Sequence, residues 1–331
     1  MEIELNFVQD QKELIEICFR KARKEAERMG KQRDRLKKAK SQAIKRIEVS
    51  ANYFNEAMQK PAAAFPYLKK LHPFYKELIE ATLDLDKTLP AIKRMKASGK
   101  IALRLKRQYI GKAKALEKGE ERKAKAIVSE FYGRLSSIAK NAEQAIKEYN
   151  KTVKMARELP NVRFDLKTVI IAGYPNTGKT TILGRLTKSK PKIAEYPFTT
   201  QKLQIGYLEQ GYEKVQLIDT PGLLDRPLEK RNKIERKAIA ALRHLANSIV
   251  FVADPTERCG FPLEKQANLL GEIEKELKGI PILVVLNKAD IASEEEIKAG
   301  KKAFPKAIAE GHEIESALKE EIAKMLKNGP V

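Results

Sequence analysis

Residues 173–180 read GYPNTGKT, a glycine-rich stretch that ends in a lysine and a threonine. The apolar run TVIIA precedes it at 168–172, and the segment TTILGRLTK at 180–188 continues with helical spacing. A glycine-rich turn between a buried strand and a helix is the context of a phosphate-binding loop. The stretch therefore predicts an α/β domain with a phosphate site at the end of this strand.

The residue types in this loop suit phosphate chemistry. Gly173 and Gly178 permit backbone conformations in which successive N–H groups converge on phosphate oxygens, and the following helix offers its positive end. Lys179 supplies a charge to the β and γ phosphates, and the Thr180 hydroxyl is a ligand for Mg²⁺. We expect the nucleotide to contact Asn176, Thr177, Gly178, Lys179, Thr180 and Thr181.

Further strands follow in the same half of the chain. Four short runs alternate with helical segments, and most are continuously apolar: LQIGYLE (203–209), KVQLIDT (214–220), SIVFVAD (248–254) and PILVVLN (281–287). Continuous apolar runs are typical of strands buried on both faces, and strands that alternate with helices make βαβ units. The pattern predicts a P-loop domain with a mainly parallel sheet and helices on both faces.

Two motifs between these runs complete a magnesium and γ-phosphate site. In DTPG (219–222), Asp219 is the expected Mg²⁺ partner and the Gly222 amide can sense the γ phosphate. In YPFTTQK (196–202), Thr200 is the expected Mg²⁺ ligand, with Thr199 as the alternative. We assign catalytic roles to Lys179, Thr200 and Gly222, and metal contacts to Thr180, Thr200 and Asp219. The next residue, Leu223, cannot orient an attacking water, so slow unaided turnover is expected.

Base selection is assigned to NKAD (287–290). The Asp290 carboxylate can accept two hydrogen bonds from the N1 and N2 edge of guanine, which adenine cannot supply. Asn287 and Lys288 would brace the loop and pack on the base. The segment ESALK (315–319) could add a last contact, a backbone N–H from Ala317 to the guanine carbonyl, and we include Ser316 and Leu318 beside it in the nucleotide site; the alternative is a helix N-cap by Ser316.

The first half of the chain differs in pattern and charge. Residues 1–160 carry 38 Lys and Arg against 21 Asp and Glu, whereas residues 161–331 carry 28 against 23. Apolar residues recur at spacings of three and four, which predicts a helical bundle. Prolines 61, 66, 73 and 90 predict breaks, an irregular bridge over 61–75, and long helices over about 90–116 and 119–158. We place the domain boundary at residue 160.

Two basic segments indicate the partner. Residues 31–46 carry eight basic residues against one acidic, and residues 93–114 contain no acidic residue. One charged helix alone is ordinarily a solvated face, but repulsion on this scale favours a polyanion as partner. We expect RNA to be bound through its phosphates by Lys31, Arg33, Arg35, Lys37, Lys38, Arg104, Lys106 and Arg107. The aromatic side chains Tyr109, Phe131 and Tyr132 have core spacing and are not assigned to base stacking.

Several classes are excluded. No apolar run approaches the roughly 20 residues that a membrane helix needs. Cys18 and Cys259 match no zinc or disulfide spacing and are interpreted as packing residues of a reducing compartment. We expect a cytoplasmic, monomeric protein with no membrane partner.

The motifs together resemble a known family. PFTT, DTPG, the segment LLDRPLEKRNKIERKAIAALRHL (223–245) and ERCGFPLEKQ (257–266) are similar to the nucleolar GTP-binding protein family, the Nog type within the Obg-like GTPases. The segment LHPFYKELI (71–79) and the basic helices resemble that family's amino-terminal domain. The chain ends just after the GTPase domain, as in short archaeal members.

The resemblance implies a GTPase that binds pre-ribosomal particles and assists maturation of the large subunit, with the helical domain on ribosomal RNA. It also implies a role for Asn176, which in related loops helps to hold a potassium ion against the phosphates; the alternative is that it merely tolerates the turn. Two other functions remain open: an RNA-binding scaffold whose nucleotide site serves folding, and a translation-associated or membrane-targeting GTPase.

Overall fold

The computed structural model describes residues 5–30, 34–66, 70–160, 162–187, 191–194, 203–210, 213–222, 224–227, 231, 233–309 and 314–328. The chain forms two compact units. The helical unit contains residues 3–67 and 83–157, and the sheet unit contains residues 68–82 and 158–331.

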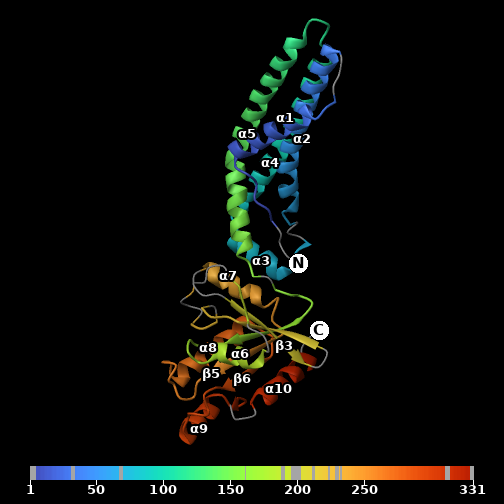
Figure 1. Ribbon diagram of the computed structural model, residues 1–331. Coiled ribbons are helices and arrows are strands. Elements are labelled where there is room, and N and C mark those ends of the chain that lie inside the picture. The colour runs from blue at the N-terminus through green and yellow to red at the C-terminus, as the bar shows by residue number, and fades with distance from the viewer. Residues whose placement is uncertain are drawn as a thin grey trace. The chain divides into compact units, whose positions relative to one another are not determined.

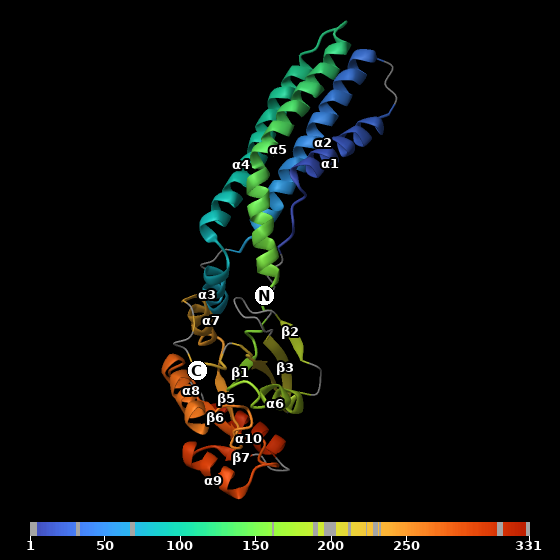
Figure 2. The same cartoon turned by 90° about the vertical axis from the view of Figure 1, so that its left-hand side faces the viewer.

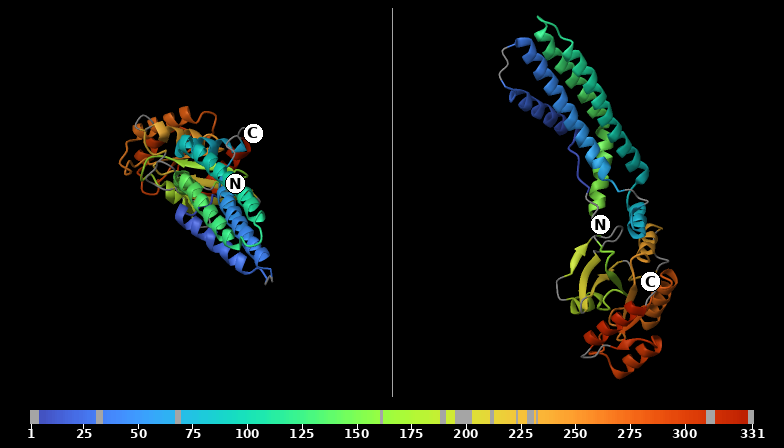
Figure 3. Two further views of the ribbon diagram at one scale, coloured as in Figure 1. Left: turned by 90° about the horizontal axis from the view of Figure 1, so that it is seen from above. Right: turned by 90° about the vertical axis from the view of Figure 1, so that its right-hand side faces the viewer.

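The helical unit is built from four helices: α1 (Gln11–Glu27), α2 (Arg35–Ala64), α4 (Leu85–Lys114) and α5 (Glu121–Arg157) (Figure 1). An aspartate begins three of them, because Asp10, Asp34 and Asp84 each accept a hydrogen bond from a backbone N–H in the first turn. Figure 3 shows α2, α4 and α5 running alongside one another. The predicted helical bundle is confirmed.

Large apolar side chains at helical spacing form one core in this unit. The largest buried members include Phe54, Met58, Met95, Phe131 and Tyr149. Tyr109 is also fully buried and packs edge-on against Phe131, so its assignment to the core holds. Cys18 is buried too, and burial raises the pKa of its thiol to about 12, which agrees with a packing role.

Two of the predicted proline breaks are wrong. Pro61 and Pro90 lie inside α2 and α4, so the segment 61–64 is helical rather than an irregular bridge. Pro90 follows soon after the start of α4 and Pro61 comes shortly before the end of α2, where losing one N–H donor disturbs few turns. The carbonyl of Pro61 also accepts a hydrogen bond from the Tyr149 hydroxyl at 2.9 Å.

The sheet unit holds a seven-stranded sheet of order β2-β3-β4-β1-β5-β6-β7. Its strands are β1 (Lys167–Ala172), β2 (Lys192–Ala194), β3 (Leu203–Gln210), β4 (Glu213–Asp219), β5 (Ser248–Ala253), β6 (Ile282–Leu286) and β7 (Ile308–Ala309) (Figure 2). The pairs from β4 through β7 are parallel, and β2–β3 and β3–β4 are antiparallel. The mainly parallel sheet is confirmed, as are its five predicted strands.

Helices surround this sheet: α6 (Lys179–Leu186), α7 (Lys233–Leu242), α8 (Leu263–Glu276), α9 (Glu294–Ala303) and α10 (Ile314–Asn328). Val169 and Ile171 of β1 share an apolar cluster with α6 and α10. Ile170 between them is equally buried, and side chains alternate along a strand, so both faces of the sheet are covered.

The short helix α3 (Pro73–Thr82) belongs to the sheet unit, although the predicted boundary at residue 160 assigned it to the helical half. It packs along α7. Packing of aromatic rings explains why α3 belongs to the sheet unit. His72 stacks on Phe164 with ring centroids 3.9 Å apart, and Tyr75 meets the same ring edge-on at 5.1 Å. The Tyr75 hydroxyl donates to the Pro160 carbonyl at 2.8 Å.

Candidate nucleotide-binding site

The loop from Gly173 to Gly178 joins β1 to α6, as its sequence predicted. Three of its residues have positive φ: Gly173 (136°), Asn176 (63°) and Gly178 (96°). A side chain at Gly173 would collide with the backbone of Val252, so glycine is required by space as well as by conformation. The loop thus has the backbone form that lets N–H groups turn toward an anion.

Lys179 lies within this loop. Its Nζ donates to the Tyr174 carbonyl at 2.8 Å, and the Thr177 hydroxyl donates to the same oxygen at 2.9 Å. Burial lowers the pKa of Lys179, opposed in part by the charge of Asp219. A buried ammonium group with one carbonyl partner retains two further donors. Lys179 is therefore placed to pair with an anion that enters the loop.

Thr180 and Asp219 come from different elements and meet. Thr180 Oγ1 donates to Asp219 Oδ2 at 2.6 Å, because β1 and β4 are adjacent parallel strands that end at the same edge. Asp219 is fully buried, and its Oδ1 has no hydrogen-bond partner among the described residues. Burial raises the pKa of Asp219, against a hydrogen bond from Thr180 and the charge of Lys179.

These two side chains fit a Mg²⁺ site. A buried carboxylate oxygen without a partner, next to a threonine hydroxyl, supplies the hard oxygen donors that Mg²⁺ prefers. No group of three or more His, Cys, Asp or Glu side chains able to hold a metal occurs in the described part of the chain. Thr180 and Asp219 supply only part of the octahedral oxygen shell of Mg²⁺, so the ion would need further oxygen ligands, such as phosphate oxygens and water.

The segment after Asp219 is braced by its own side chains. The Gly222 amide donates to Asp225 Oδ2 at 2.6 Å, and Arg231 Nη1 donates to the Gly222 carbonyl at 3.0 Å. Arg231 is 3% exposed and lies 3.5 Å from Asp225, so this ion pair is buried. The Gly222 amide, predicted to sense the γ phosphate, is thus held by Asp225 in this conformation. Sequence reasoning missed both Asp225 and Arg231.

The guanine motif is joined to the phosphate loop. Asn287 Nδ2 donates to the Thr177 carbonyl at 2.7 Å, and a side chain at Gly178 would collide with the Asn287 amide. The bracing role predicted for Asn287 has this contact as its physical basis. Asp290 is exposed at the end of the motif.

Lys288 makes a contact that the sequence analysis did not foresee. It has a positive φ of 62°, and its Nζ lies 2.7 Å from Oδ2 of the fully buried Asp254. Asp254 follows the last residue of β5, at the edge of the sheet where the parallel strands β1 and β6 also end. A carboxylate at the carboxyl end of a buried strand is a signal that could have found it.

The residues of the last predicted base contact, Ser316 to Leu318, lie in the helix α10. Ser316 and Ala317 occupy the first turn of α10, which begins at Ile314, and the strand that precedes this helix in the chain is β7. Leu318 is 2% exposed and shares a core cluster with Ile322. The Leu318 side chain is therefore a packing group, because its spacing with Ile322 is that of a buried helix face. Thr181 is exposed in α6.

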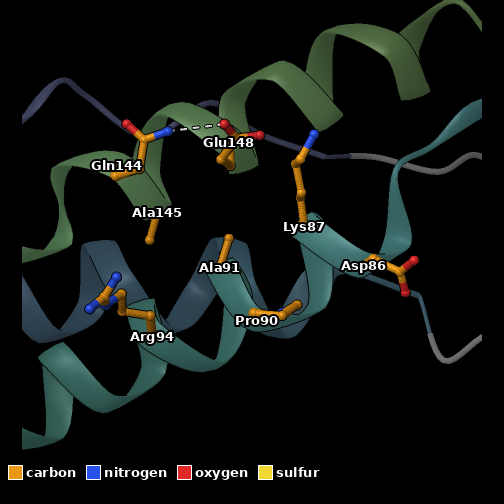
Figure 4. Close-up of a pocket in the computed structure, with 8 residues that line it drawn as sticks. All are labelled: Asp86, Lys87, Pro90, Ala91, Arg94, Gln144, Ala145 and Glu148. Atoms are coloured by element: carbon orange, nitrogen blue, oxygen red, sulfur yellow. Dashed lines mark hydrogen bonds between the residues drawn. The ribbon is translucent and has the colours of Figure 1, made fainter.

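Some predicted positions lie outside the described residues, namely Lys31, Arg33, Thr199, Thr200 and Leu223. A hollow of about 500 Å³ lies elsewhere, between α4 and α5 of the helical unit (Figure 4). Its charged lining residues are Asp86, Lys87, Arg94 and Glu148. No residue of the phosphate loop or guanine motif lines it, so it is not part of the nucleotide site.

The fold, the loop and the two following motifs define a P-loop GTPase domain that follows a helical domain in the chain. Residues 3–163 match the family described as the NOG1 N-terminal helical domain, and residues 168–288 match the 50S ribosome-binding GTPase family. The chain belongs to the nucleolar GTP-binding protein family, as its motifs predicted.

Two relatives illustrate the match. An uncharacterized protein of Methanocaldococcus jannaschii is 36% identical over 86% of this chain and 80% of its own length. Nucleolar GTP-binding protein 1 of Saccharomyces cerevisiae is 30% identical over 77% of this chain and 39% of its own length. The chain thus spans about two fifths of the yeast relative. None of the described helices is long and apolar enough to cross a membrane.

Proposed function

We propose that this chain is a GTP-hydrolysing factor of ribosome biogenesis that acts on large-subunit precursors and binds ribosomal RNA through its helical unit. The observation that carries the proposal is the presence, in one chain, of a GTPase domain and a helical unit with exposed basic residues on α2 and α4. The names of its eukaryotic relatives support the same class of function. The protein is proposed to act as a monomer in the cytoplasm.

The positive charge gathers where α2 begins and α4 ends. These ends lie at the same end of the helical unit (Figure 2), and Lys40 Nζ of α2 donates to the carbonyl of Lys114 at 2.9 Å. We define the basic tip as the exposed residues Arg35, Lys37 and Lys38 at the start of α2, together with the exposed Arg104 and Arg107, which lie 10 and 7 residues before the end of α4. The ion pairs described in this unit involve other cations, such as Lys87 with Asp84 and Lys112 with Glu130.

A cluster of exposed cations suits an RNA backbone. Each cation that neutralises a phosphate releases a bound counterion, which favours binding and makes it depend on salt. The basic tip offers no exposed aromatic ring for base stacking, since Tyr109 and Phe131 are buried. The tip therefore favours recognition of RNA by shape and phosphate position rather than by sequence.

Hydrolysis is proposed to proceed by in-line attack of water on the γ phosphate. Lys179 pairs with the β and γ oxygens, and the loop amides orient the triphosphate. Thr180, Asp219 and Thr200 would hold Mg²⁺, which when bound neutralises charge on the phosphate oxygens. Leu223 offers no group to orient the water, so unaided turnover is slow. We further propose that Asn176 helps to hold a potassium ion against the phosphates.

Contacts with the γ phosphate are proposed to favour an ordered state of the two segments that follow the phosphate loop and DTPG, and loss of the γ phosphate a loosened state. The second of these leads into α7, which packs on α3. In the chain, α3 is the only described helix between α2 and α4. A shift of α7 would therefore act on an element connected at both ends to the helical unit.

The test is sedimentation of cell lysate in the presence of a non-hydrolysable GTP analogue. The chain is expected to travel with precursors of the large ribosomal subunit, and a variant Asp290→Asn serves as the matched control with unchanged phosphate loop. If the wild-type chain stays at the top of the gradient with every nucleotide, the proposed function is wrong. If Lys179→Ala leaves association and release of the particle unaffected, the nucleotide site serves folding and the chain is a scaffold.

A further inference from the structure

The carboxylate of Asp254 is fully buried and accepts four hydrogen bonds. Oδ1 accepts from the Thr256 amide at 3.0 Å and from the Thr256 hydroxyl at 2.6 Å. Oδ2 accepts from the Cys259 amide at 2.8 Å and from Lys288 Nζ at 2.7 Å. Four donors occupy the four lone-pair sites of an ionised carboxylate, so Asp254 is satisfied only as an anion.

Lys288 supplies the positive charge that stabilises the ionised carboxylate of Asp254. Burial alone would raise the pKa of Asp254, but hydrogen bonds from Lys288 and Thr256 outweigh it and the pKa is lowered. An ionised carboxylate without its cation would be costly at this depth. Lys288 has a side chain that is 24% exposed, so part of its length remains accessible beyond the ion pair.

The loop that begins at Asp254 also contacts the phosphate loop. We define the bracket as residues 254–261, DPTERCGF. Phe261 at its end stacks on Tyr174 of the phosphate loop with ring centroids 4.1 Å apart. Gln266 of α8 holds both ends of the bracket by hydrogen bonds: its side chain accepts from the Asp254 amide at 2.8 Å and donates to the Phe261 carbonyl at 2.8 Å. The bracket is therefore tied to both parts of the nucleotide site.

The guanine motif is held on two sides. Asn287 is fixed to the phosphate loop through the Thr177 carbonyl, and Lys288 is fixed to the bracket through Asp254. Between these anchors the backbone of Lys288 takes a left-handed conformation that costs a non-glycine residue free energy. Two anchors on consecutive residues leave the following loop little freedom to move Asp290.

We infer that Asp254 is a positioning residue for base recognition: it holds Lys288 and thereby the guanine motif, and so raises both affinity and selectivity for guanine nucleotides. This inference rests on the proposed use of NKAD for guanine. A purely structural reading is the competitor, in which Asp254 only shapes the bracket through Thr256 and Cys259. The two readings differ in whether the effect of Asp254 passes through Lys288.

The experiment is a double-mutant cycle on the full chain, with fluorescent GDP as the probe. Affinity and dissociation rate are measured for the wild type, Asp254→Asn, Lys288→Met and the double variant. Asp254→Asn removes the negative charge and, in either orientation, places an amide N–H₂ opposite two of the four donors, so the ion pair with Lys288 is lost. Each single variant is expected to weaken GDP binding about tenfold, mainly by faster dissociation. The double variant is expected to be no weaker than the weaker single variant.

Thr256→Val is the matched control. It removes a hydroxyl donor from the same carboxylate but leaves Lys288 in place, so GDP affinity is expected to stay within about twofold of the wild type. Inorganic tripolyphosphate, which has no base, is expected to bind Asp254→Asn as well as it binds the wild type. Thermal unfolding of every variant shows whether the chain remains folded.

The outcomes separate the two proposals. If the wild type prefers GDP over ADP but Asp254→Asn retains full affinity, or if the two single effects multiply in the double variant, the positioning role is wrong. A loss for Thr256→Val equal to that for Asp254→Asn would overturn it equally, in favour of a structural role. If the wild type itself shows no preference for GDP, the proposed GTPase function fails, and this inference fails with it.

Discussion

The Thr180 hydroxyl donates a hydrogen bond of 2.6 Å to Asp219, and the other oxygen of that buried carboxylate has no partner in the described part of the chain. The two residues are 39 positions apart in sequence. They meet because parallel strands β1 and β4 are neighbours and end at one edge. A buried polar atom left unpaired costs free energy, and a cation next to it relieves that cost.

Thr180 should therefore control the magnesium dependence of nucleotide binding. The variant Thr180→Ala removes a hydroxyl donor at the proposed metal site and is expected to lose about tenfold in affinity for GTP, or about 1.4 kcal/mol. Calorimetry with Mg²⁺ and with EDTA measures the effect. Removal of Mg²⁺ should weaken the wild type but change Thr180→Ala little, and Thr180→Ser should keep the wild-type response. Equal responses of all three proteins would contradict the assignment.

Asp290 should decide which base is bound. A carboxylate accepts two hydrogen bonds from guanine, whereas an asparagine in its place offers one acceptor and one donor. Asp290→Asn is expected to weaken GDP binding by at least about a hundredfold and to improve binding of XDP, whose exocyclic oxygen accepts from the new amide. Competition between GDP, XDP and ADP measures this change. Loss of all three nucleotides together would indicate a folding defect rather than altered selection.

The sequence predicted what local chemistry dictates. The loop 173–180, five strands and the helical half follow from residue types and spacing within single segments, and the structure has them. The strands that it missed, β2 and β7, are 3 and 2 residues long at the two edges of the sheet. Such short edge strands bury too little to leave an apolar run.

Contacts between residues far apart in the chain could not be predicted from the sequence pattern. Asp254 and Lys288 are 34 residues apart, and only the order of strands in the sheet brings them together. The placement of α3 in the sheet unit depends in the same way on the ring of Phe164, far along the chain from Tyr75. Leu318 was interpreted from its motif alone, whereas its burial depends on the packing of α10.

The basic tip should govern affinity for RNA. The triple variant Arg35→Gln, Lys37→Gln and Lys38→Gln is expected to bind large-subunit RNA more weakly and to reduce the slope of log affinity against log salt concentration by about 2 to 3. A charge-matched control replaces exposed lysines elsewhere on α5: Lys140, Lys151 and Lys154. Filter binding over a range of salt concentrations separates the two. Equal losses would mean that only net charge matters, and the proposed tip would be wrong.

Asn176 should link hydrolysis to the monovalent cation. If it helps to hold potassium against the phosphates, GTP turnover in potassium buffer should exceed that in sodium buffer by about tenfold or more, since transition-state charge is stabilised. Asn176→Ala should abolish this difference. Phosphate release under single-turnover conditions provides the measurement. Equal turnover of the wild type in both buffers would rule out the role.

The attachment of α3 should depend on one hydroxyl. Tyr75 donates to the Pro160 carbonyl at 2.8 Å and accepts from the amide of fully buried Val162 at 3.3 Å. Tyr75→Phe leaves both backbone groups unpaired in an apolar setting. It is expected to lower the free energy of unfolding of the sheet unit by about 1 to 3 kcal/mol.

Tyr132 supplies the matched control for that loss. Its hydroxyl is buried in the helical unit and has no hydrogen-bond partner among the described residues. Removal of an unsatisfied buried hydroxyl relieves a desolvation cost, so Tyr132→Phe is expected to be neutral or stabilising. Thermal unfolding followed by circular dichroism compares the two variants. If Tyr75→Phe proves as harmless as Tyr132→Phe, α3 is held by its aromatic stacking, and the hydroxyl adds nothing to its attachment.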